Sequence, residues 1–402
     1  MIPAETEAGI WTGSSGLRIS NQVLLSLTIV GTAAACGAGF VALAPNRLVS
    51  GTPIALWRAV GIASVVAMAL LGALLLATAL LRPRPALHRI AAGLAAALLL
   101  LVLNAAGQAA THLSANAVPV ARVSLGAGFW ALSVCAALAV VDGLQRARTG
   151  PVVQLLAAAV LAGAVFAMAQ RGAFAGLSLA REYAARRDIF GAAVLRHLVL
   201  VAASVGPALV IGVPLGVAAA RRPGLRGPLF ALLNLLQTIP SVALFGLLIV
   251  PLSALATAVP ALARLGVGGI GPAPAIIALV LYALLPVVRN TDAGLAGVDP
   301  AVVEAGSGMG LTRRQLLWRV ELPLALPVLL AGLRIVTVQA IGLAVVAALI
   351  GAGGLGTFVF QGLGQYAVDL VLLGALPAIF LALAADFLLR VVSGVLRRSE
   401  AR

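Results

Sequence analysis

The chain has 402 residues, of which 62% are hydrophobic and only 10% are charged. Soluble domains carry about 25% charged residues, so this composition is typical of a polytopic membrane protein and argues against a soluble enzyme. The net charge is +15, and all 27 basic residues are arginines. They lie at the ends of apolar runs rather than along one basic face, which argues against nucleic acid as a partner.

Ten apolar runs can each cross the ~30 Å hydrocarbon core, which takes about 20 helical residues. Their Leu- and Ala-rich composition lacks strict alternation and therefore favours helices over a barrel. We predict an all-α polytopic bundle whose first apolar run is a retained span, because that run is longer than the core of a signal peptide. The predicted spans are 22–44, 59–81, 90–108, 125–141, 152–170, 197–219, 229–251, 273–289, 324–350 and 367–391.

The placement of arginine predicts the orientation of this bundle. With the N-terminus inside, 17 arginines, from Arg18 to Arg402, lie in cytoplasmic segments and nine lie outside. This bias predicts that both termini are cytoplasmic. Most of the outer arginines fall in 171–196, which also carries Glu182 and Asp188, and we interpret that stretch as an amphipathic helix on the membrane surface.

The chain divides near residue 175. Residues 1–175 form a block of five simple spans, in which Cys36 and Cys135 are interpreted as small buried apolar residues. Residues 176–402 hold five more spans, with recurrent proline and glycine. The spacing of histidine and cysteine predicts no metal site.

A polar island interrupts the second half at 299–323. Asp299 can cap the free amides of a helix, and Pro300 suits its first position. The sequence therefore predicts a short helix that ends at Gly308 and Gly310.

A second short helix is predicted immediately after this turn. Thr312 and Gln315 match a capping box, and we expect this helix to end where Leu322 and Pro323 begin the next span. Two short helices joined by a glycine turn make a firm elbow, which another protein could approach closely. The alternative is a helical loop without a partner.

The island carries a specific motif: Glu304-Ala305-Gly306, three residues, Gly310, nine residues, then Val320-Glu321-Leu322-Pro323. It resembles the cytoplasmic signature of ABC importer permeases, which is Glu-Ala-Ala, three residues, Gly, nine residues, Ile, one residue and Leu-Pro. The spacing matches throughout, with Gly306 in place of alanine and Val320 in place of isoleucine. In that family this segment is the coupling helix that docks into a groove on the ATPase subunit. The resemblance implies that the ATPase-coupling residues are Glu304, Ala305, Gly306, Gly310, Leu311, Thr312, Leu322 and Pro323.

Three further stretches narrow the resemblance. Residues 281–291, 237–241 and 350–356 are similar to the glycine betaine/choline (osmoprotectant) importer permeases. This likeness covers about 190–392, and the extra N-terminal spans resemble a longer subgroup. It implies a permease of the bacterial cytoplasmic (inner) membrane, surrounded by membrane lipid. The implied partners are ABC ATPase subunits, a second identical or homologous permease subunit and an extracytoplasmic solute-binding protein.

Nucleotide chemistry is expected on another subunit. A P-loop needs lysine to bind phosphates, and this chain has none, so ATP and Mg are expected on a partner ATPase. The stretch 351–356 fits G-x-G-x-x-G, but it follows a membrane span rather than a strand. We interpret Gly351, Gly353, Gly354 and Gly356 as a flexible outer turn that helps to gate the path.

Polar residues within the spans allow two interpretations. Gln237, Ser241 and Gln339 either line the translocation path or join helices by hydrogen bonds, and the helix-joining role is favoured. Pro240 is expected to break the seventh span. For Arg334 and Asp386 we favour a structural ion pair or a snorkelling arginine.

Two other classes of function remain open from the residues alone. An ion-gradient-driven secondary transporter is one, although no mid-span carboxylate or histidine suggests proton coupling. A membrane scaffold or sensor without transport activity is the other. Aromatic residues make up only 4% of the chain, so a cage for a trimethylammonium group is expected on the separate binding protein.

Overall fold

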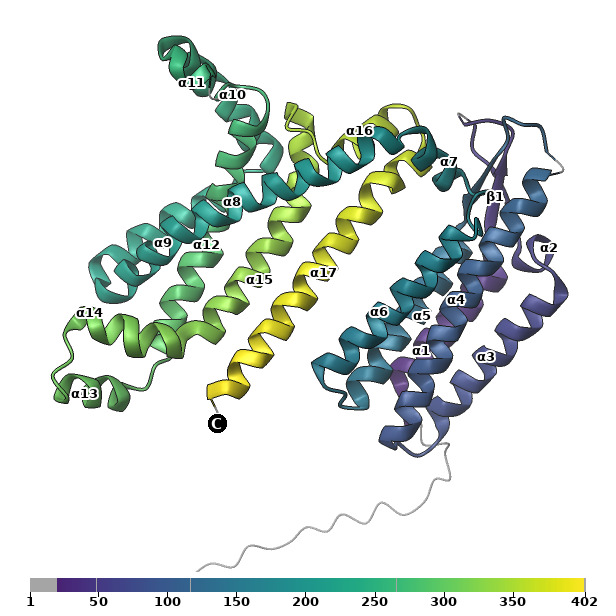
Figure 1. The fold of residues 1–402 in the computed structure, drawn as a ribbon, viewed down its shortest axis with the longest axis horizontal. Helices are drawn as coiled ribbons and strands as arrows, with labels where there is room; N and C mark the ends of the chain where they lie inside the picture. The colour runs from purple at the N-terminus through teal and green to yellow at the C-terminus, as the bar shows by residue number, and fades with distance from the viewer. Residues whose placement is uncertain (1–19, 48, 116, 265, 401–402) are drawn as a thin grey trace, which may run out of the picture. The chain divides into compact units, whose positions relative to one another are not determined.

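The computed structural model describes residues 20–47, 49–115, 117–264 and 266–400. Arg18 and Arg402, which the orientation argument counts, lie outside the described residues. Contacts divide the chain into an N-terminal unit, Met1–Leu177, and a C-terminal unit, Ser178–Arg402 (Figure 1). Nine described helices are long and apolar enough to cross a membrane, and Gln22–Gly37 is a shorter apolar helix. The predicted all-α polytopic bundle is confirmed.

The described part of the N-terminal unit holds six helices: α1 (Gln22–Gly37), α2 (Leu56–Ala59), α3 (Ile62–Leu80), α4 (Pro85–Ala115), α5 (Ala127–Arg146) and α6 (Pro151–Gln170). α1 packs against α3 and α5, and α4 packs against the same two helices. α6 lies against α4, and none of its residues is buried. A polar contact supports the bundle at one end, where the buried Asn21 amide donates to Asp142 at 2.7 Å.

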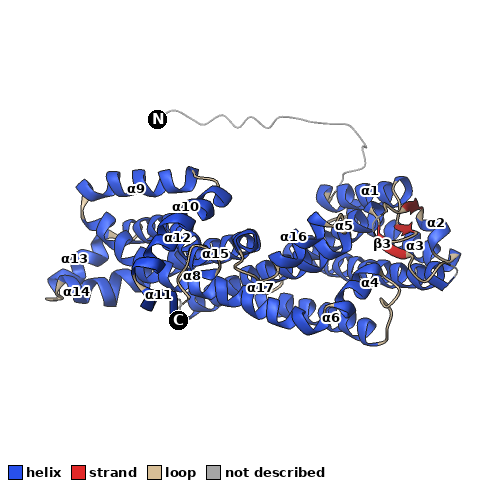
Figure 2. Cartoon of the chain, turned by 90° about the horizontal axis from the view of Figure 1, so that it is seen from above, coloured by secondary structure: helices blue, strands red, loops and turns tan. Residues whose placement is uncertain are grey.

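A small antiparallel sheet in the N-terminal unit was not predicted. Its strands, drawn in red in Figure 2, are β1 (Val41–Ala44), β2 (Thr52–Ile54) and β3 (Arg122–Leu125). Their order in the sheet is β2-β1-β3. The first predicted span continued to Ala44, but α1 ends at Gly37 and the chain turns into β1. The backbone passes very close to itself there, because a Cβ added to Gly126 would lie 2.2 Å from the carbonyl oxygen of Gly39. Only glycine permits such an approach.

The C-terminal unit holds six long helices: α8 (Arg187–Arg221), α9 (Pro223–Thr238), α10 (Ser241–Ala258), α12 (Pro272–Ala296), α15 (Leu322–Val346) and α17 (Val368–Glu400). Shorter elements connect them: α7 (Ser178–Ala185), α11 (Pro260–Arg264), α13 (Pro300–Gly308), α14 (Arg313–Leu316), a π-helical turn (Leu317–Glu321), a 3-10 turn (Ala347–Ile350) and α16 (Gly356–Gly364). One end of the unit, the elbow end, carries α13 and α14 (Figure 1). The opposite end, the turn end, carries α11 and α16.

Two predicted elements of this unit need correction. The seventh predicted span, 229–251, is two helices that meet at Ile239 and Pro240, as expected for a proline break. The amphipathic stretch 171–196 is not one helix, because it contains α7 and, from Arg187 on, the start of α8. α7 packs against α17, and its Glu182 is buried in an ion pair with Arg186. Its place on the membrane surface stays a prediction.

Glycines bring α8, α12 and α15 into close contact. A Cβ added to Gly216 of α8 would lie 2.5 Å from the Cβ of Thr291, and one added to Gly332 of α15 would lie 2.6 Å from the Cβ of Asn290. Small residues let membrane helices approach closely enough for dispersion forces to hold them. These positions therefore fix the packing of α12 between its two neighbours.

Replacing Gly216 with leucine will destabilise the C-terminal unit. The new side chain meets Thr291 and the carbonyl oxygen of Val288, and such overpacking costs about 1–3 kcal/mol. Gly191→Leu in the same helix is the matched control, because nothing lies within 4 Å of its added Cβ. Thermal unfolding in detergent will show a lower Tm for Gly216→Leu alone. Equal Tm values for the two variants would contradict this packing.

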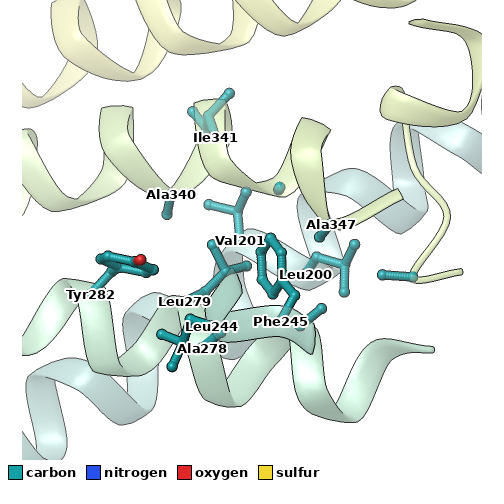
Figure 3. Packing of buried hydrophobic residues seen from close by; sticks show 13 residues of the cluster. Leu200, Val201, Leu244, Phe245, Ala278, Leu279, Tyr282, Ala340, Ile341 and Ala347 are labelled. Atoms are coloured by element: carbon teal, nitrogen blue, oxygen red, sulfur yellow. The ribbon is translucent and has the colours of Figure 1, made fainter. Parts of the chain in front are cut away.

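An apolar cluster joins four helices toward the turn end (Figure 3). Leu200 of α8, Phe245 of α10, Leu279 of α12 and Ile341 of α15 are all buried in it. Ala352, just after the 3-10 turn, also belongs to it. The cluster therefore ties the glycine-rich segment that follows α15 to the main helices.

Candidate functional site

The first half of the elbow has the geometry that the sequence predicts. The Asp299 carboxylate accepts from the Ala301 amide at 2.9 Å, and Pro300 stands at the first helical position. At the other end of α13 the Leu311 amide donates to the Gly306 carbonyl at 3.2 Å, and Gly310 has φ +84°. This is a Schellman ending, which requires a left-handed residue and so favours glycine.

The second half differs from the prediction in one respect. Thr312 and Gln315 form the expected capping box, with the Thr312 amide donating to Gln315 Oε1 at 2.8 Å. The helix does not stop at Leu322 and Pro323, because α14 continues through the π-helical turn into α15. Proline has no amide hydrogen to donate. A π-helical turn accommodates the missing hydrogen bond without ending the helix.

The outer surface of the elbow is exposed, while the interface between α13 and α14 is buried. Glu304 and Ala305 are exposed on α13, and Met309 and Trp318 are exposed by 76% and 64%. Leu311 and Leu322 are half-buried, and Thr312 and Pro323 are exposed. Gly306 is buried where α13 meets α14, and a Cβ there would lie 2.7 Å from a methyl group of Leu316. The elbow is thus internally packed, and its outer face carries the exposed side chains of Met309 and Trp318.

Ion pairs that the sequence reading missed support the base of the elbow. Glu321, only 6% exposed, pairs with Arg221 at the end of α8. Arg226 of α9 donates to the Asp292 carboxylate of α12 at 2.8 and 3.1 Å. Buried carboxylates need such partners. The only sequence signal was an acidic residue beside an apolar run, which does not identify its partner.

A hydrogen-bond pair spans the break between α9 and α10. The Gln237 side-chain amide donates to the Tyr282 carbonyl at 2.6 Å, and the Tyr282 hydroxyl donates to the Ile239 carbonyl. The carbonyl beside Pro240 is therefore satisfied by α12. For Gln237 this contact supports the helix-joining interpretation. Ser241, the first residue of α10, and Gln339 of α15 are half-buried.

Of the two interpretations of Arg334 and Asp386, a structural ion pair or a snorkelling arginine, the structure shows the ion pair. Arg390, one helical turn after Asp386, shares the same carboxylate at 2.6 Å. The pair links α15 to α17. Charges within spans are costly, and this arrangement gives both of them a structural partner.

The glycine turn, residues 351–356, has a tightly specified backbone. Gly351, Gly353 and Gly354 have φ values of +77°, +81° and +84°. L-residues rarely adopt such values. At Gly356 a Cβ would lie 1.9 Å from the carbonyl oxygen of Val345.

Contacts on two sides hold the glycine turn. Arg196 of α8 donates to the Ala352 carbonyl at 3.1 Å, and the Gly271 amide, at the start of α12, donates to the Ile350 carbonyl at 2.8 Å. Gly354 packs on the fully buried His197, whose Nδ1 would lie 3.2 Å from an added Cβ. The turn therefore contacts both α8 and α12, and the flexibility and gating role expected for it stay a prediction.

Comparisons with known proteins find relatives for both halves of the chain. Residues 19–180 match the family described as ABC transporter permease YehY, N-terminal domain, and residues 212–398 match the binding-protein-dependent transport system inner membrane component. The chain is 44% identical to the osmoprotectant import permease protein OsmW of Salmonella typhimurium, over 50% of this chain and 88% of that protein.

Two further matches extend this set. The glycine betaine/carnitine/choline transport system permease protein OpuCB of Bacillus subtilis is 38% identical, over 48% of this chain and 82% of its own length. A solved chain of the inward-facing MetNI methionine ABC transporter is 24% identical, over 52% of this chain and 96% of its own, with a TM-score of 0.46.

Proposed function

The chain belongs to the inner-membrane permease components of binding-protein-dependent transport systems, and on that premise we propose that it carries glycine betaine, choline or a related osmoprotectant. It is a multi-pass membrane protein and not an enzyme, since in this family a separate subunit hydrolyses ATP. The names of its relatives support the choice of solute. We place it in the bacterial inner membrane with the elbow in the cytoplasm.

The elbow carries this proposal. Its motif residues Glu304 and Ala305 are exposed on the short helix α13, and Gly310 is exposed in the turn that leads into α14. α13 packs internally against α14, and this arrangement suits a surface that docks into another protein. In the proposed complex, two ABC ATPase subunits bind ATP and Mg and contact the elbows of two permease subunits. An extracytoplasmic binding protein delivers the solute to the turn end.

In the proposed mechanism, one continuous helix transmits force from the ATPase at the elbow to the glycine turn. Helical structure runs without interruption from Arg313 to Ile350, through the π-helical turn, α15 and the 3-10 turn. At 1.5 Å per residue these 38 residues follow a path of about 57 Å, which bends between α14 and α15 (Figure 1). A displacement of the elbow would therefore be passed along this helix to the glycine turn, and alternating access would follow if that turn leaves its contacts with α8 and α12.

Solute uptake in cells that lack their own osmoprotectant importers tests the proposal. We expect radiolabelled glycine betaine or choline to accumulate only when this chain is expressed with its ATPase and binding protein. Uptake should stop on ATP depletion by arsenate and persist when a protonophore dissipates the gradient while ATP is maintained. The opposite pattern would indicate a secondary transporter, and no uptake of either solute would contradict the assignment.

Replacing Gly354 with leucine will slow uptake by at least about tenfold. The substitution forces an L-residue to φ +84° and pushes its side chain onto His197. The left-handed conformation alone costs about 1–2 kcal/mol, which corresponds to about a tenfold change in a conformational equilibrium. Uptake at saturating binding protein measures the effect. Gly364→Leu is the control, because Gly364 is exposed and nothing lies within 4 Å of its added Cβ. A normal rate of uptake by the Gly354→Leu variant would show that the glycine turn does not take part in gating.

A further inference from the structure

The N-terminal unit contains an apolar groove that transport does not explain. It has a volume of about 570 Å³ and lies between α1, α3 and α5, with Leu98 of α4 at its floor. Buried residues Met68, Leu75 and Cys135 form its depth, while Ile29 and Leu76 stand exposed at its rim. Pockets of about 300–1,000 Å³ are the size that holds one small ligand.

The lining of the groove excludes water and polar ligands. Thr28 and Thr32 are two of its few polar residues, and both hydroxyls donate within α1, to the carbonyls of Leu24 and Thr28, each at 2.7 Å. Water needs two to four polar partners to occupy a cavity. The groove therefore requires an apolar occupant.

The groove is elongated along the membrane helices. On α1 its lining runs from Leu27 to Cys36, a distance along the helix of nine residue steps, or about 13 Å. Both α1 and α3 are apolar helices of the bundle, so the groove suits an occupant that comes from bilayer hydrocarbon. An empty groove forfeits dispersion contacts along its whole lining. A single extended hydrocarbon chain, parallel to α1, restores them.

The short helix α2, whose Leu56 lines the groove, also carries groups that suit a phospholipid headgroup. Leu56 of α2 lines the groove, and the next two residues are Trp57, which is 55% exposed, and Arg58, which is also exposed. Tryptophan favours the membrane interface, and arginine binds phosphate through charge-assisted hydrogen bonds. Within the described residues no carboxylate pairs with Arg58.

We propose that this groove binds one acyl chain of a glycerophospholipid from the leaflet that α2 faces, with Trp57 and Arg58 beside its headgroup. The site gives the N-terminal unit a role of its own, as the part of the protein that holds a structural lipid. We expect the groove to bind this lipid more tightly than the protein surface binds bulk bilayer lipid. The acyl chain packs against three helices, and Arg58 supplies a cation for the phosphate.

Photo-crosslinking of the full chain in phosphatidylethanolamine vesicles tests this site. The probe is phosphatidylglycerol with a diazirine in the middle of one acyl chain, and adducts are located by peptide mass spectrometry. We expect adducts on the groove faces of α1 and α3, near Thr32 and Ala69, at several-fold the density found on α6. α6 serves as the internal reference because none of its residues is buried. Equal density on α6, or fewer adducts in the groove, would overturn the proposal.

Variants of the protein distinguish the site for the acyl chain from the site for the headgroup. Gly72→Phe fills the groove, since only Thr32 Oγ1 lies as near as 4.0 Å to its added Cβ, and the excess of adducts should disappear. Ala158→Phe on the exposed face of α6 is the matched control and should leave the excess unchanged. Ala69→Leu is a smaller filling variant should Gly72→Phe fail to insert. Arg58→Gln should lower the yield from phosphatidylglycerol toward that from a phosphatidylcholine probe. An unchanged adduct pattern in both filling variants would show that the groove is not the site.

Discussion

Replacing Gly310 with tryptophan is expected to abolish solute uptake while the protein still inserts in the membrane. The residue closes α13 with φ +84°, so an L-residue strains the turn by about 1–2 kcal/mol. Nothing lies within 4 Å of an added Cβ, and the new side chain would therefore stand on the outer face of the elbow. Uptake and membrane content, measured on the same cells, separate loss of coupling from loss of folding.

Smaller substitutions of Gly310 distinguish the effect of backbone strain from the effect of a large side chain. Gly310→Asn should retain more uptake than Gly310→Ala, because asparagine tolerates the left-handed region better. Gly308→Ala is the matched control, since Gly308 is exposed within α13 and its φ is not positive. Uptake near the wild-type rate in Gly310→Trp would refute the docking role of the elbow.

Removing the positive charge of Arg221 is expected to uncouple the elbow from the bundle. Arg221→Gln leaves the Glu321 carboxylate buried without its counter-ion, and an unsatisfied buried partner costs about 1–3 kcal/mol. We expect a lower Tm in detergent. We also expect ATP hydrolysis by the reconstituted complex to lose its stimulation by solute-loaded binding protein.

The neighbouring arginine provides the control for this experiment. Arg222 is exposed and forms no ion pair within the described part of the chain, so Arg222→Gln should leave both readouts unchanged. The double variant Arg221→Gln with Glu321→Gln should recover part of the Tm, because it removes the unpaired charge. Additive losses in the double variant would show that the two side chains do not act together.

Sequence reasoning predicted the elbow because its signals are local. Asp299 with Pro300, and Thr312 with Gln315, specify helix starts within four residues, and all of them act as predicted. The continuous helix through Pro323 was missed. A proline suggests a boundary from its own chemistry, whereas a π-helical turn that absorbs it depends on the helix on both sides.

Long-range partners could not be derived from the sequence. Arg221 and Glu321 are 100 residues apart, and nothing near either one identifies the other. The contact of Tyr282 with Ile239 is of the same kind, since it depends on how α9 returns beside α12. The sheet in the N-terminal unit was missed because its strands have only three or four residues, too few to show an alternating pattern.

Crosslinking from the elbow tests the central claim most directly. In a background with Cys36→Ser and Cys135→Ser, Ala305→Cys places a single thiol on the exposed face of α13, where benzophenone maleimide can be attached. Illumination of the purified complex should join this chain to the ATPase subunit, with a yield that changes when ATP is bound, while Gly364→Cys should give no such product. A complex in which Ala305→Cys never reaches the ATPase would contradict the account.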